Sequence, residues 1–263
     1  MRFPSMSIIS RRLAQLMCLL VLTGICASSA VITFGGEDLN AGPGGPFTNS
    51  NAAATSFKSA ASALGSIGLI TFESAPLGAF TSLPVASGVT ASGPSGLSIN
   101  NVPNFPSAPA VDGFNTTPGG AQYIEDQAGT LTITFATPVQ FFGAYLTGLQ
   151  ALFAQDTITF NDGTTQTINA LETGTSGSVG AVNFLGFTDA GKLISSVTIT
   201  STNGGSTDYI GVDDVMYQTG VPEPASMTLV LAAFLGFVFI WQVKRRSLNT
   251  IIRRRSLPDS DLV

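Results

Sequence analysis

Apolar residues alternate with threonine or serine in several short segments, and this alternation most constrains what the chain can fold into. Successive strand residues point to opposite faces of a sheet, so a period of two predicts strands with one buried and one solvated face. The clearest segments are 69–72, 131–135, 157–160 and 196–200. Between the third of these and Thr165–Asn169 stands Asn161-Asp162-Gly163. Asp-Gly tolerates the positive φ of a tight turn, so this stretch predicts a hairpin.

Further short segments, separated by turn residues, complete an all-β pattern. They are Val89–Ala91, Leu97–Asn100, Val139–Thr147, Val182–Phe187 and Tyr209–Tyr217. Their aromatic residues are typical of a core rather than of a binding platform (Phe141, Phe142, Tyr145, Phe184 and Phe187). About ten strands with frequent turn signals predict a two-sheet β-sandwich of jelly-roll type over residues 67–218.

One short helix is expected before the strands, in an N-terminal segment covering residues 31–66. Ser50 or Asn51 can cap it, and Gly65 suits its C-terminal end. Ala53, Phe57, Ala60, Ala61 and Leu64 fall near helical spacing, so we expect the Phe57 face to pack on the sandwich. Residues 40–46 and the Gly/Pro-rich residues 92–118 are expected to be loops, and long loops at a sandwich rim often bind ligands.

The charge and the rare residue types exclude several classes of function. Residues 31–221 contain two lysines and thirteen acidic residues, a net charge of −11. This surface repels phosphate backbones, so we expect no nucleic-acid partner. The chain has no histidine, which excludes imidazole-based triads and most transition-metal sites. Both cysteines, Cys18 and Cys26, lie in the N-terminal segment that is expected to be cleaved, so the mature protein should have no disulfide, zinc–thiolate site or cysteine nucleophile. The acidity either maintains solubility or binds divalent cations.

Both ends of the chain carry apolar segments. Arg2, Arg11 and Arg12 precede the apolar residues 13–25, and small residues end at Ala30, which together predict a cleaved signal peptide over residues 1–30. Residues 225–243 are apolar and free of charge, and a helix of this length spans about 28 Å, close to the thickness of a bilayer core. We therefore expect a transmembrane helix there. By the positive-inside rule, residues 247–263 form a cytoplasmic basic tail.

The C-terminal tract resembles the sorting signal of PEP-CTERM proteins. The residues that match are Val221, Pro222, Glu223 and Pro224, the apolar helix that follows, and the basic stop Lys244, Arg245 and Arg246, so the tract covers residues 221–246. The resemblance implies processing by an exosortase-type sorting enzyme. It also implies an exported protein that is held in the inner membrane at least transiently and then passes to the cell surface or the extracellular matrix. Two prolines keep the motif extended, as a peptidase requires.

The body of the chain resembles carbohydrate-binding modules of jelly-roll type. The resemblance rests on Phe72-Glu73 near the first strong strand and on Ile210-Gly211-Val212-Asp213-Asp214-Val215 in the last. It implies a structural calcium ion held by Glu73, Asp213 and Asp214. Because adjacent strand residues face opposite ways, we expect only one of the two aspartates to be buried, and Asp214 shares the face of Val212. The alternative is two solvated aspartates at a strand end.

These observations predict a non-enzymatic β-sandwich that is sorted to the cell surface. It would be an envelope or matrix component that binds polysaccharide or packs as a structural element. The alternative is an anchored carbohydrate-active hydrolase, for which Glu73, Glu125, Asp126 and Glu172 supply carboxylates. Calcium is the one cofactor expected, in a structural role.

Overall fold

The computed structural model describes residues 31–103, 112–149, 155–169, 181–189, 191–203, 206–207 and 209–220, together with positions 233, 234, 236, 237 and 240. The chain falls into two compact units, Met1–Thr219 and Gly220–Val263. In the second unit, the described positions between 233 and 240 are helical. The signal peptide in the first unit, and the sorting motif, the basic stop and most of the predicted transmembrane helix in the second, lie outside the described residues. No helix of the described part is long and apolar enough to cross a membrane.

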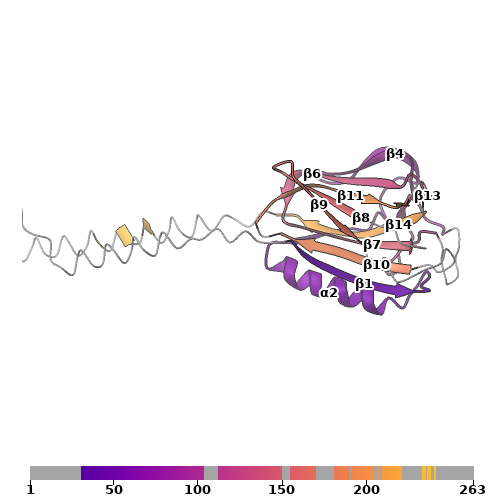
Figure 1. The fold of residues 1–263 in the computed structure, drawn as a ribbon, viewed down its shortest axis with the longest axis horizontal. Coiled ribbons are helices and arrows are strands. Elements are labelled where there is room, and N and C mark those ends of the chain that lie inside the picture. The colour runs from indigo at the N-terminus through magenta and orange to yellow at the C-terminus, as the bar shows by residue number, and fades with distance from the viewer. Residues whose placement is uncertain are drawn as a thin grey trace, which may run out of the picture. The chain divides into compact units, whose positions relative to one another are not determined.

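The first unit is built on twelve strands and one helix (Figure 1). The strands are β1 (Ile32–Leu39), β2 (Ile67–Ile70), β3 (Gly78–Ala86), β4 (Val89–Asn100), β5 (Tyr123–Asp126), β6 (Thr130–Val139), β7 (Phe141–Leu149), β8 (Gln155–Phe160), β9 (Thr165–Asn169), β10 (Ala181–Thr188), β11 (Ile194–Thr200) and β14 (Ile210–Gln218). The helix is α2 (Thr48–Ser62), and the two-residue strands β12 (Thr202–Asn203) and β13 (Ser206–Thr207) pair separately.

The twelve strands form one antiparallel sheet that nearly closes on itself. Its order is β1-β10-β7-β14-β5-β4-β6-β11-β8-β9, with β2 beside β14 and β3 beside β4. A single apolar core contains side chains from both ends of this order, among them Phe142, Leu146 and Phe187 from one end and Ile133 and Val197 from the other. The predicted all-β class with one helix is therefore confirmed.

The two ends of the sheet differ on their outer faces. In the threonine half (β4, β6, β11, β8 and β9), alternate residues enter the core and the others form rows of hydroxyls. One row crosses five strands in register through Ser92, Thr132, Thr198, Thr157 and Thr167. Its hydroxyls contact one another, with 3.0 Å between the Oγ1 atoms of Thr132 and Thr198. The hairpin predicted at Asn161–Gly163 joins β8 to β9 and is confirmed.

In the helix-covered half (β1, β10, β7 and β14), both faces of β10, β7 and β14 are buried, whereas the edge strand β1 is mostly exposed. Every residue of β7 and β10 is buried, because α2 packs on the face that turns away from the shared core. Phe57 of α2 is fully buried, and its ring lies 5.4 Å from that of Phe184 and 6.0 Å from that of Phe141. The expectation that the Phe57 face of the helix covers the sheet is confirmed.

The helix begins earlier than expected and is capped from another element. It starts at Thr48, and the preceding Phe47 offers no side-chain cap. The carboxylate of Asp38 on β1 instead accepts hydrogen bonds from the backbone N–H groups of Asn49 and Ser50, both at 2.9 Å. The predicted caps Ser50 and Asn51 are therefore wrong, because a strand distant in sequence supplies the acceptor.

Three strands of the twelve-stranded sheet, β1, β3 and β5, have no counterpart in the sequence-based prediction, and neither do the two-residue strands β12 and β13. The expected loop over residues 92–118 is wrong in its first part, because β4 runs without interruption from Val89 to Asn100. Pairing on both sides of Gly93 and Gly96, at residues 89–92 with β3 and β6 and at residues 97–100 with β3 and β5, keeps these glycines in the strand despite their low β propensity. The second part of that loop, from Asp112 onward, forms a wall of the site described next.

Candidate functional site

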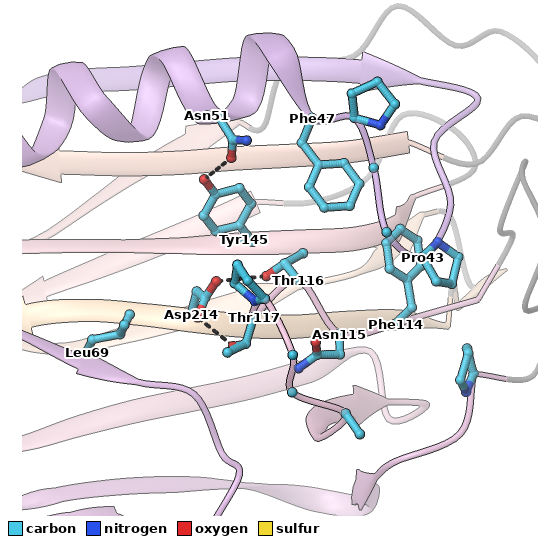
Figure 2. A pocket seen from close by; sticks show the side chains of 18 of the residues that line it. Pro43, Phe47, Asn51, Leu69, Phe114, Asn115, Thr116, Thr117, Tyr145 and Asp214 are labelled. Carbon is cyan, nitrogen blue, oxygen red and sulfur yellow. Dashed lines mark hydrogen bonds between the residues drawn. The ribbon is translucent and has the colours of Figure 1, made fainter.

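A pocket of about 770 Å³ opens on the outer face of the helix-covered half. One wall is the loop of Pro43–Pro46 and the beginning of α2, and the other is the chain from Phe114 to Ala121. The floor contains Tyr145 from β7 (Figure 2), and Met216 from β14 also lines the pocket. The pocket thus occupies the gap that the helix and the loop leave between them on one sheet surface.

The second wall, residues 112–122, lies directly on the backbone of the sheet. A Cβ atom on Gly113 would collide with the backbone of Gly211 on β14, and one on Gly148 would collide with Asp112. Thr147 of β7 fixes the loop at this crossing, because its hydroxyl accepts a hydrogen bond from the N–H of Phe114 at 2.9 Å and donates one to the Phe114 carbonyl at 2.8 Å. Glycines at the crossing therefore let the loop pack against the sheet.

The two consecutive aspartates of β14 hold the middle of the same loop. One carboxylate oxygen of Asp213 accepts hydrogen bonds from the N–H groups of Thr116 and Thr117, at 2.7 and 3.1 Å. Asp214 accepts from the hydroxyl of Thr116 at 3.1 Å and from that of Thr117 at 2.7 Å (Figure 2). The aspartates therefore position the wall of the pocket.

The prediction that Asp213 and Asp214 point to opposite faces, with Asp214 the buried one, is wrong. Both are buried, with exposed fractions of 0% and 9%, and both contact the Thr116 hydroxyl. The pairing of β14 with β7 shifts register between Asp213 and Met216, and Asp214 adopts a φ of 47° in the left-handed region. A bulge of this kind re-aims a side chain, which the rule of alternation cannot anticipate.

Burial and the neighbouring charge perturb this acidic pair. Desolvation, followed by the repulsion of Asp214, raises the pKa of Asp213 to about 7, although the N–H group of Thr116 opposes the shift. The other carboxylate oxygen of Asp213, Oδ1, is buried and has no hydrogen-bond partner among the described residues. Burying a carboxylate oxygen without a partner is costly, so this atom can take a proton or a cation.

Glu73 binds the other end of the loop. Its Oε1 atom accepts hydrogen bonds from the N–H groups of Ala121 and Gln122, both at 2.9 Å, and from the side-chain amide of Asn115 at 3.0 Å. Phe72, which precedes it, is buried and has a φ of 60°. Glu73 and the two aspartates therefore hold adjacent parts of one loop.

The three predicted calcium ligands do not form a single coordination group. Asp213 and Asp214 lie together, whereas Glu73 is engaged with Asn115 and the backbone beyond it. Among the described residues, no three acidic side chains are placed to hold a metal ion. The oxygen atoms of the aspartate pair and of the Thr116 and Thr117 hydroxyls are nonetheless of the type that calcium prefers. The calcium site therefore stays a prediction.

Inside the pocket, aromatic and polar groups lie close together. The hydroxyl of Tyr145 donates a hydrogen bond to the side-chain carbonyl of Asn51 at 2.6 Å (Figure 2). Burial raises the pKa of Tyr145, with the charges of Asp214 and Asp38 adding to the effect, so the phenol stays protonated. The rings of Phe47 and Phe114 lie 6.1 Å apart on the opposing walls. Sequence reasoning missed this use of Asn51 and Tyr145, because it placed one as a helix cap and the other in the core.

The carboxylates considered for a hydrolase do not gather in the pocket. Its described lining contains a single acidic side chain, Asp214. Glu125 on β5 is buried and accepts hydrogen bonds from Asn100, at 2.6 Å, and from Gln127. Burial raises the pKa of Asp126 to about 6, and its carboxylate caps the turn at Ala128. Glu172 lies outside the described residues.

Comparison with known proteins adds no assignment to this geometry. No protein-family model matches the chain, and no curated protein matches it.

Proposed function

We propose that the chain is an exported, non-enzymatic protein that binds polysaccharide in the pocket between α2 and residues 114–121. The observation that supports this most is the composition of the pocket. Aromatic rings on its floor and walls suit the apolar faces of sugar rings, and Asn51, Tyr145 and Asp214 offer the few directed polar groups that a small-molecule site needs. We propose in addition that the nearly closed sheet is a two-sheet sandwich of jelly-roll type.

A binding role fits the described carboxylates better than hydrolysis does. Glycoside hydrolysis needs two carboxyl groups across the scissile bond, and the described lining offers only Asp214. The carboxylate of Asp214 is itself held by two threonine hydroxyls. The hydrolase is the second candidate, for which Asp214 supplies the one carboxylate of the described lining.

A glycan panel separates these two roles. The full chain, purified in mild detergent, should retain at least one polysaccharide without releasing reducing sugar. The variant Asn51→Ala should weaken retention, whereas Ser56→Ala, which changes an exposed residue on the same helix outside the pocket, should not. Release of reducing ends that stops in Asp214→Asn would establish the hydrolase instead, and no retention of any glycan would refute binding.

We propose further that residues 221–246 deliver the protein to an exosortase-type enzyme at the inner membrane. The support is the order of the Pro-Glu-Pro motif, the apolar stretch and the basic residues in the sequence. Deletion of residues 225–243 should release the protein from the membrane fraction. Changing Glu223 to alanine should block maturation, which mass spectrometry of the surface form would detect. An unaltered mature mass would count against recognition by a sorting enzyme.

We also propose that the Asp213–Asp214 pair binds a structural calcium ion. The unpartnered Oδ1 atom of Asp213 supports it, and Glu73 would act by holding the loop that carries Thr116 and Thr117. When bound, calcium would supply the charge that the buried pair lacks. It should raise the melting temperature, an increment expected to disappear in Asp213→Asn and Glu73→Ala but to persist in Asp162→Asn. A melting temperature that calcium leaves unchanged would exclude the site.

A further inference from the structure

Lys58 lies in the lining of the pocket, and its charge is rare in this part of the chain. Residues 31–221 contain only two lysines and no arginine. The other lysine, Lys192, makes three contacts on the threonine half. Its ammonium group lies 3.0 Å from the carboxylate of Asp162, 2.9 Å from the hydroxyl of Thr164 and 5.0 Å from the ring centre of Phe160. Lys58 forms no ion pair with a carboxylate of the described residues.

The position of Lys58 on the helix places its charge away from the aromatic groups of the pocket. Asn51 and Lys58 are seven residues apart, so they lie on the same side of α2, about 10 Å from each other along the axis. Asn51 meets the hydroxyl of Tyr145, near Phe47 and Phe114. The helix side of the pocket therefore offers an aromatic region followed, two turns later, by an exposed cation.

The carboxylate in the pocket forms no ion pair with this cation. Both oxygens of Asp214 already accept hydrogen bonds from the hydroxyls of Thr116 and Thr117, at 3.1 and 2.7 Å. Asp213 and Glu73 hold the loop of the opposite wall, so the negative charge of the pocket lies on that side, and salt screens it over about 8 Å. An anionic group beside Lys58 thus meets an ammonium that has no carboxylate partner among the described residues.

We propose that the pocket binds an acidic oligosaccharide, with sugar rings over the aromatic region and a carboxylate of the ligand paired with Lys58. This inference rests on the proposed function and names the class of glycan that the same site selects. An exposed ion pair changes affinity by up to about fivefold, and partial desolvation in the pocket extends this toward tenfold. Lys58 is therefore a specificity residue, and the aromatic contacts supply the rest of the binding.

Matched ligands and matched variants test the proposal. The ligands are oligogalacturonate, oligomannuronate and hyaluronan fragments, each compared with its carboxyl-reduced, neutral counterpart at physiological salt. Calorimetry on the full chain in detergent should show binding about fivefold to tenfold tighter for the acidic member of at least one pair. Lys58→Met should remove this preference and Lys58→Arg should keep it. Lys192→Met, which makes the same change in net charge on the threonine half, should leave the preference intact.

The outcomes distinguish failure of the acidic-ligand inference from failure of the proposed glycan binding. Equal affinity for the acidic and neutral members, or equal behaviour of Lys58→Met and Lys192→Met, would overturn the acidic-ligand inference while glycan binding stands. Absence of binding to both members of every pair would overturn the inference and count against the proposed function as well. Unchanged melting temperatures of the Lys58 variants, measured by circular dichroism, would show that any loss of preference is local.

Discussion

The two outer faces of the sheet are built from similar strands, but one is left uncovered and the other is covered by a helix and a loop. On the threonine half, alternate side chains are hydroxyls that contact water and one another across β4, β6, β11, β8 and β9. On the helix-covered half, the equivalent positions are aromatic or apolar and are covered by α2 and by the loop from Asp112. The pocket forms where the two covers fail to meet, so the binding site proposed above depends on incomplete coverage of the sheet.

The largest expected difference between the halves concerns burial. Phe57→Ala should destabilise the protein by about 3–5 kcal/mol, because it removes a fully buried ring from the contact between α2 and the sheet. Thermal and denaturant unfolding of the full chain would measure the change. A loss below about 1 kcal/mol would mean that the helix covers the sheet only loosely.

The halves should also differ in the sign of their pH dependence. Burial raises the pKa of Asp213 to about 7 on the covered half, so its folded form binds a proton more tightly than the unfolded chain does. Acidification from pH 8 toward pH 4 should therefore stabilise the protein, on the order of 4 kcal/mol, and this gain should be lost as the pH rises through 7. Melting temperatures across this range should vary less in Asp213→Asn.

Asp162 on the threonine half provides the opposite sign. Hydrogen bonds from Thr164, and then from Lys192, lower its pKa to about 2. Its contribution to stability is present above the ordinary pKa of an aspartate and is lost as the pH falls toward 2. Asp162→Asn should leave the dependence between pH 5 and 8 unchanged, and a flattened curve in this variant would contradict the assignment to Asp213.

A smaller effect is expected at the join between β1 and the helix. Asp38→Ala removes the acceptor for two N–H groups at the start of α2 and should cost about 1 kcal/mol. Asp38→Asn, which retains one acceptor oxygen, should lose less. Because this end of the helix borders the pocket, hydrogen exchange of Asn49 and Ser50 should rise in Asp38→Ala, and unchanged exchange would contradict capping by β1.

The smallest effect should come from the threonine half. Thr198→Ala removes one cross-strand hydroxyl contact, with Thr132 at 3.0 Å, and should cost between about 0.2 and 1 kcal/mol. Its melting temperature should lie close to that of the unsubstituted chain. A loss of stability as large as that of Phe57→Ala would contradict the contrast between a solvent-facing and a covered outer face.

This contrast also explains how far the sequence predicts the fold. The threonine half follows the rule of alternation, so β6, β8, β9 and β11 could be located from residues such as Ile133 and Val197. Strands β7, β10 and β14 were found through their apolar and aromatic content. Strand β1 was not predicted, because glycines and acidic residues have low β propensity. Its extended conformation is stabilised by pairing with β10, which is distant in sequence.

The candidate site was only partly predictable for a related reason. Glu73, Asp213 and Asp214 stood out as acidic residues, but their attachment to Thr116, Thr117 and the backbone near Ala121 depends on contacts across about fifty to one hundred residues. Asn51 and Lys58 carry no local signal at all. The role proposed for them depends on which strands α2 covers, mainly β1 and β10 with β7 beside them. The spacing of Phe57 predicts that the helix packs on the sheet but not on which strands.

The register shift at Asp214 has a genetic consequence. Loss of this single codon would remove the extra residue and restore an unbroken ladder between β14 and β7. The strand would survive such an in-frame deletion, while Thr116 and Thr117 would lose one of their two anchors. Deletion of one codon would thus disrupt the wall of the pocket and leave the sheet intact, so that a related protein with this deletion would keep the fold without the proposed site.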